Sequence, residues 1–219
     1  MNQLPNGLLL VFQIVGTVGG IFLGAGLAYE YARRRERENR IQSQVDKCNE
    51  ALFRLSHQLA FLVDFEATHA EECRGAHFPH IMMAEAPPAE YERYAIKASD
   101  LAFLLDGDTT SIPGKIALQD QRFRSLLQNI NERSQLHREV LYPVFEALEY
   151  PPNWADANAM LSIRHRQTLD GLTNSILRMV AEQLLGHHRV LDEAREALQA
   201  RFPNHKFVRL LPVDDLRRR

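Results

Sequence analysis

The feature that most constrains this chain is an uncharged apolar segment near its N-terminus. From Leu8 to Tyr29 only Gln13 and Thr17 are conventionally polar, and no Lys, Arg, Asp or Glu interrupts the run. A helix needs about 20 apolar residues to cross the hydrocarbon core of a bilayer. The segment has that length, and we expect it to form a single transmembrane helix.

The residues around this segment predict an uncleaved anchor and its orientation. A cleaved signal peptide has a basic start, a shorter apolar stretch and a small-x-small exit site; here no Lys or Arg precedes Arg33, the apolar run is longer, and no Ala-x-Ala exit is present. Five arginines follow the segment: Arg33, Arg34, Arg35, Arg37 and Arg40. Because basic residues favour the cytoplasmic side, we expect an inner-membrane or plasma-membrane protein with its N-terminus outside and residues 33–219 in the cytoplasm. The same arginines are candidates for contact with lipid headgroups.

Small residues recur along one face of the expected transmembrane helix. The stripe consists of Gly16, Gly20, Gly24 and Ala28, each four residues after the one before. Such spacing lets a second helix backbone approach closely, so we expect self-association through this face. The alternative is that glycine is merely tolerated in a membrane helix, and Gly19 and Gly26 lie off the stripe.

Bulk composition excludes several classes of protein. The chain has 219 residues, 45% hydrophobic and 25% charged, which is enough to bury a core and is untypical of a disordered protein. Its two cysteines, Cys48 and Cys73, are too few for a disulfide scaffold, and we expect them to be unpaired in a reducing compartment. With 26 basic against 28 acidic residues, no nucleic-acid partner is expected.

Beyond the anchor, apolar spacing predicts helices. Neither Gly nor Pro occurs between Leu27 and Arg74, so one helix is expected to leave the membrane and continue. Its seam alternates steps of four and three residues through Ile41, Val45, Cys48, Leu52, Leu55, Leu59 and Leu62. This is the spacing of a coiled coil or a bundle, and it leaves open whether the helix pairs with another copy or with later helices of its own chain.

Three further helices are expected, each bounded by proline or glycine. The first begins near Pro88 and ends at Asp106–Asp108, the second runs from about 115 to 148 with a local shift at Pro143, and the third from about 156 to 201; residues 111–114 are expected to form a turn. The predicted fold class is all-α: a transmembrane helix continuing into a long helix and an antiparallel cytoplasmic bundle. The predicted parts are an anchor (1–32), a basic collar and long helix (33–74), a connection (75–87), the remaining helices (88–201) and a tail (202–219).

One interruption of the seam suggests metal chemistry. After Leu62 the same steps reach Glu66, His69 and Cys73, and His77 continues the spacing. Side chains one helical turn apart on one face can share a metal ion, so these four residues are the candidate ligands for a transition metal. Glu66–His69 also has the Glu-x-x-His form of di-iron bundles, but the motif occurs once where such sites need two. His137, His165 and His187 offer a mixed site across helices, and the alternative is that all these groups are buried without binding metal.

No nucleotide-binding, hydrolase or Cys-x-x-Cys motif is present, so the sequence offers no strong reason to propose an enzyme. We therefore expect a scaffold or adaptor that binds membrane lipid, copies of itself and other proteins, with no cofactor required. Two alternatives stay open, namely a metal or redox sensor that uses Glu66, His69 and Cys73, and a membrane effector or channel subunit. The layout, an N-terminal anchor followed by a coiled coil, resembles that of bacterial YhcB-type envelope proteins and implies no residue roles.

Overall fold

The computed structural model describes the backbone of residues 6–148 and 153–208, and the side chains of residues 24–148 and 153–208. The described part is all-helical, without a β-strand. Its α-helices are α1 (Asn6–Phe65), α2 (Pro79–Met82), α3 (Ser111–Leu136), α4 (Tyr142–Glu146), α5 (Trp154–Met160) and α6 (Ile163–Arg201). Two π-helical turns, Glu66–Ala70 and His137–Leu141, follow α1 and α3, and 3-10 turns cover Tyr91–Arg93, Ala98–Leu105 and Gly107–Thr109.

The chain divides into two compact units, residues 1–46 and 47–219. In the first unit, residues 24–43 of α1 are exposed, including Leu27 and Tyr29 at 73% and 66%. Among the described residues, no helix combines the length and apolar character needed to cross a bilayer. The predicted span, Leu8–Tyr29, lies mostly outside the residues whose side chains are described.

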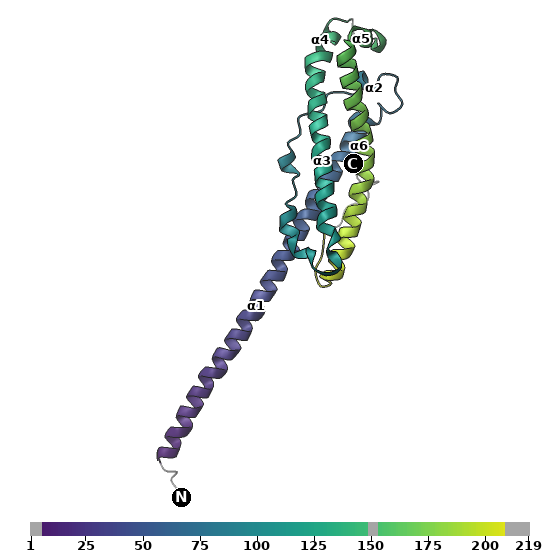
Figure 1. Cartoon of the computed structure of the whole chain (residues 1–219). Coiled ribbons are helices and arrows are strands. Elements are labelled where there is room, and N and C mark those ends of the chain that lie inside the picture. The colour runs from purple at the N-terminus through teal and green to yellow at the C-terminus, as the bar shows by residue number, and fades with distance from the viewer. Residues whose placement is uncertain (1–5, 149–152, 209–219) are drawn as a thin grey trace. The chain divides into compact units, whose positions relative to one another are not determined.

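The second unit is a bundle built on the C-terminal part of α1, on α3 and on α6 (Figure 1). Asn49 in α1 bonds to Lys206 just beyond α6, whereas Arg74 bonds to the carbonyl of Leu177 in the first half of α6, so α1 and α6 are antiparallel. Arg201 at the end of α6 bonds to Thr109 just before α3, so α3 and α6 are antiparallel as well. The prediction of a helical bundle is therefore confirmed.

The predicted seam of α1 packs inside the chain's own bundle. Cys48, Leu52, Leu55, Leu59 and Leu62 are each at most 1% exposed. Ile41, at the N-terminal end of the seam, is 41% exposed. The seam residues from Cys48 to Leu62 are thus covered by their own chain. For these residues the pairing is intramolecular.

The helix predicted from Pro88 to Leu105 is wrong. Residues 83–96, here called the strap, run back along α1 and α3 with only a short 3-10 turn, and a second 3-10 segment follows at Ala98–Leu105. Side chains of α1 and α3 form hydrogen bonds with backbone N–H and carbonyl groups of the strap. In a helix these backbone groups would bond to one another. Asn131 bonds to both the N–H and the carbonyl of Ala89 at 3.1 Å, and Gln58 donates to the carbonyl of Tyr94 at 3.1 Å. The strap occupies the place expected for the first part of this helix, and Gly107 has a positive φ of 79°.

Other helix boundaries also differ from prediction. Residues 111–114 do not form a turn, because α3 already begins at Ser111, and Pro113 falls within its first turn where a proline costs no backbone bond. The expected shift at Pro143 is present as the π-helical turn His137–Leu141. The expected fourth helix is split at Leu161–Ser162, where the Ser162 hydroxyl accepts the His165 N–H and caps α6. In the tail, Phe202 and Phe207 are buried, and residues 209–219 lie outside the described residues.

Candidate functional site

The four predicted metal ligands lie where α1 ends. Glu66 and His69 belong to the π-helical turn, and Cys73 to the turn that follows, which closes at Gly75 with a φ of 78°. The Glu66 carboxylate accepts two hydrogen bonds from the Arg74 guanidinium, at 2.8 and 2.7 Å. This pairing raises the pKa of Arg74 and occupies the carboxylate that the metal hypothesis needs.

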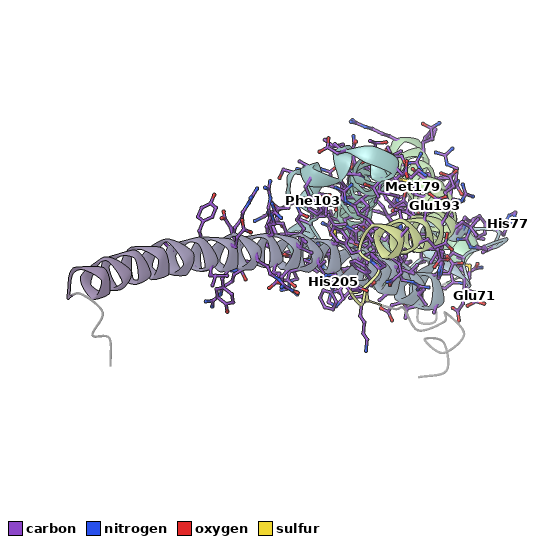
Figure 2. The ribbon with its side chains drawn as sticks, turned by 90° about the horizontal axis from the view of Figure 1, so that it is seen from below. Glu71, His77, Phe103, Met179, Glu193 and His205 are labelled. Atoms are coloured by element: carbon purple, nitrogen blue, oxygen red, sulfur yellow. The ribbon has the colours of Figure 1, made fainter. Side chains whose placement is uncertain are left out.

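The remaining three candidates do not complete a ligand set. His69 packs against the Phe65 ring with centroids 5.0 Å apart, and burial lowers its pKa. Burial raises the pKa of the Cys73 thiol, while His77 is exposed at the edge of the bundle (Figure 2). Across the described residues, no three or more His, Cys, Asp or Glu side chains are grouped so that they could hold a metal ion. Both cysteines are free and buried, in agreement with the prediction that they are unpaired.

The three histidines proposed for a mixed site have different surroundings. His165 is exposed, His137 accompanies Arg133, and His187 belongs to a buried polar layer between α1, α3 and α6. The polar layer consists of Gln58, Gln119, Asp120, Gln183 and His187, each at most 7% exposed. It is the larger of two buried polar groups in the bundle.

Asp120 is the anionic member of the polar layer. Its carboxylate accepts hydrogen bonds from Gln58 Nε2 at 2.7 Å, from the Ile96 backbone N–H at 3.3 Å and from the Tyr91 hydroxyl. Burial and the bond to Asp120 raise the pKa of Tyr91, so Tyr91 stays neutral and donates. Asp120 therefore joins α1, α3 and the strap.

Three polar groups surround the imidazole of His187. The Gln58 amide nitrogen donates to Asp120 and Tyr94, so its Oε1 is the atom that faces His187 Nε2 at 2.8 Å and must accept. Nδ1 lies 3.1 Å from Gln119 Nε2, a donor, and 2.9 Å from the Gln183 carbonyl oxygen, an acceptor. Burial lowers the pKa of His187 to about 4, which keeps the imidazole neutral at physiological pH.

A close approach of α6 to this layer depends on glycine. A Cβ on Gly186 would lie 3.2 Å from Gln119 Cδ and would collide with Nε2, the atom that donates to His187. Gly171, which lies elsewhere in α6, has nothing within 4 Å of such a Cβ. The two glycines of α6 therefore have different physical settings.

The second buried polar group is a clamp centred on Arg133, which is 1% exposed. Its guanidinium donates to the carbonyls of His80 at 3.3 Å and Ala84 at 3.2 Å, and to that of Met83. It also donates to Thr173 Oγ1 and His137 Nδ1, each at 3.4 Å. Burial lowers the pKa of Arg133 to about 10, and burial together with the Arg133 charge lowers that of His137 to about 4. The clamp attaches α2 and the start of the strap to α3.

Sequence reasoning missed both polar groups, although the apolar register contained a signal. In α3 the steps of three and four run through Ile116, Asp120, Phe123, Leu127, Ile130 and Arg133, and in α6 the same steps include Thr173, Gln183 and His187. A charged residue at a core position of an amphipathic helix must be hydrogen-bonded. The register could have identified Asp120 and Arg133 as buried, but not their partners.

The bundle also has a cavity between α1 and the strap. Its volume is about 190 Å³, and its walls include the rings of Phe61, Phe65 and Tyr94. His69 and Asp64 line the same cavity, so the π-helical turn after α1 contributes to it. His69 is thus a predicted metal ligand that borders a cavity large enough for a small molecule.

The residues predicted for membrane and lipid contact lie in the first unit. Arg33, Arg34, Arg35, Arg37 and Arg40 are exposed, and Arg34 pairs with Glu38 at 3.1 Å. Gly24 and Ala28 are open, with nothing within 4 Å of a Cβ built on Gly24. The side chains at Gly16 and Gly20 lie outside the described residues.

The described residues form a long N-terminal helix and a helical bundle whose interior contains the polar layer and the Arg133 clamp. Compared with models of known protein families, with curated proteins and with solved structures, the chain matches none.

Proposed function

We propose that this protein is a membrane-anchored adaptor whose cytoplasmic helical bundle binds other proteins, and that it self-associates through its N-terminal helix. The observation that carries the proposal is that α1 contains both the apolar segment Leu8–Tyr29 and core residues of the bundle such as Leu55 and Leu59. The same helix would then supply the membrane anchor and one wall of the bundle.

The exposed arginines support an orientation with the bundle in the cytoplasm of the cell. Lys and Arg just after a span favour the cytoplasmic side, and each contributes about 1 kcal/mol of attraction to an anionic membrane surface. The five arginines from Arg33 to Arg40 are free of core contacts and available for headgroups. The N-terminus would lie outside, at an inner or plasma membrane.

Self-association is assigned to the glycine stripe because the leucine seam is already used. Residues Cys48 to Leu62 of the seam are covered within the chain, whereas Gly24 and Ala28 are open. Small residues four apart allow two membrane helices to pack closely. We therefore propose a contact between copies through Gly16, Gly20, Gly24 and Ala28.

Partner binding is assigned to the bundle surface near α4, α5 and the start of α6. Large apolar side chains are exposed there: Tyr142 at 48%, Trp154 at 39%, Met160 at 51% and Ile163 at 73%. Aromatic residues and Met are enriched where proteins contact one another, which supports an adaptor role for this surface.

The test combines fractionation, topology and crosslinking in native membranes. Full-length protein should stay with membranes after alkaline carbonate, and alkaline phosphatase fused after Arg219 should be inactive. Crosslinked oligomers should be lost in Gly20→Ile and retained in the off-stripe control Gly19→Ile. Carbonate release would refute the anchor, active phosphatase the orientation, and unchanged crosslinking in Gly20→Ile the stripe.

Partner binding is tested by affinity purification from the same membranes. A protein that copurifies with the wild type and is lost when Trp154 and Ile163 are both changed to Ser would support the adaptor role. The control exchanges two exposed polar residues of α6, Gln167 and Glu182, for Ser. Equal recovery of the partner by both double variants would refute the assigned surface.

A further inference from the structure

The cavity between α1 and the strap has walls suited to an organic ligand. The Phe61 ring lies 6.0 Å from that of Phe65 and 5.6 Å from that of Tyr94, measured between centroids, and all three rings line the cavity. Pro87 and Pro88 of the strap add further apolar surface. The cavity volume of about 190 Å³ fits a small molecule rather than a folded partner.

One carboxylate among the charged groups that line this cavity has no partner of opposite charge. Arg93 pairs with Glu90 at 3.3 Å, so these two charges largely cancel. Asp64 is exposed, and its carboxylate has no hydrogen bond or ion pair with any residue that the structure describes. Its closeness to His69 is reflected in the pKa of that imidazole, which Asp64 raises against the larger effect of burial. The lining as a whole therefore favours a positive charge.

Aromatic rings and an unpaired carboxylate favour the same kind of ligand. The face of an aromatic ring attracts a cation, and the carboxylate adds a Coulomb attraction. We propose that the cavity binds a small organic ammonium ion with an aromatic or alkyl body, whose apolar part contacts Phe61, Phe65 and Tyr94 and whose charge lies toward Asp64. This inference is independent of the adaptor function, because it uses neither the membrane anchor nor the surface around Trp154.

Three probes of equal shape and different charge test the inference on purified full-length protein in detergent. They are phenethylammonium, 2-phenylethanol and phenylacetate, and binding is followed by ligand-observed NMR. For a ligand of about nine non-hydrogen atoms we expect a dissociation constant of about 1 mM for the ammonium ion. The alcohol should bind about fivefold more weakly, since that is the effect of one charge pair at about 4 Å in water, and phenylacetate weaker still.

Variants assign the binding to this cavity. Asp64→Asn should remove the preference for the ammonium ion over the alcohol, whereas Glu182→Gln, an exposed carboxylate on α6, should leave it unchanged. Ala89→Leu places bulk in the cavity wall and should weaken both probes, and circular dichroism checks that each variant is folded. No binding by any probe at 10-fold the expected dissociation constant, equal binding of all three, or an unchanged preference in folded Asp64→Asn would each overturn the proposal.

Discussion

Lowering the pH is expected to destabilise the bundle through His187 and His137. Burial is the main cause that lowers the pKa of each from 6.5 to about 4. In the unfolded chain both imidazoles take up a proton as the pH falls through about 6.5, whereas in the folded protein they do so only near 4. Between these values the unfolded state binds more protons, so the free energy of unfolding falls as the pH falls.

The size of this effect follows from the two pKa values. For a folded pKa of about 4 and an unfolded one of 6.5, moving from about pH 7.5 to pH 5 removes about 2 kcal/mol per histidine. The loss for both would be about 4 kcal/mol, a large part of the 5 to 15 kcal/mol typical of folded domains. Partial opening of the bundle in acid is therefore expected before the carboxylates are protonated.

Urea unfolding of the purified full chain, followed by far-ultraviolet circular dichroism at both pH values, measures the effect. His187→Gln keeps an amide donor and acceptor in the polar layer but cannot titrate, so its loss of stability between the two pH values should be smaller than that of the wild type by about 2 kcal/mol. His165→Gln controls for removing an exposed imidazole from the same helix. Equal pH dependence in the wild type and His187→Gln would refute the assignment of a low pKa to His187.

Three further predictions follow from the buried groups. Gly186→Ala should destabilise the bundle by about 1 to 2 kcal/mol in urea unfolding because the new Cβ displaces a buried amide. Its control, Gly171→Ala, should stabilise it by up to about 1 kcal/mol. Arg133→Met leaves three backbone carbonyls without their donor and should cost about 3 kcal/mol or more in the same measurement, and an unchanged midpoint would contradict the clamp. Cys48 and Cys73 should resist a thiol reagent in the native state and react in urea, because both are buried and burial raises the pKa of each thiol; rapid native labelling would contradict this.

The helices α1, α3 and α6 were predictable because each buries one apolar face, and a period near 3.6 residues records that burial in the sequence. The strap was not predictable by the same means. Tyr91, Tyr94, Ala98, Leu101 and Leu105 recur in steps of three and four, which is typical of a helix. In the folded chain the backbone of the strap, which contains Tyr91 and Tyr94, bonds instead to side chains far away in sequence, namely Gln58, Asp120 and Asn131. Local spacing contains no information about such donors and acceptors.

The candidate site was anticipated only in its location. A leucine seam that turns polar at Glu66 was interpreted as a set of ligands, but the same change also occurs where an α-helix ends. Here the helix changes to a π-helical turn at Glu66, and the Glu66–Arg74 ion pair closes the turn that reverses the chain. A single sequence cannot separate these two meanings, because both place polar side chains at core spacing.

The two meanings differ in whether other parts of the chain provide hydrogen-bond partners for the polar side chains. Glu66 receives both of its hydrogen bonds from Arg74, eight residues away, so its charge is compensated before any ion could be bound. Asp120 and Arg133, also at core spacing, form their hydrogen bonds with the strap and with neighbouring helices. Asp64 lies two residues before the π-helical turn, and no described side chain compensates it. By this criterion Asp64, which the seam pattern passed over, is left free to meet a ligand, and so is His69, whose buried Nδ1 has no hydrogen-bond partner among the described residues.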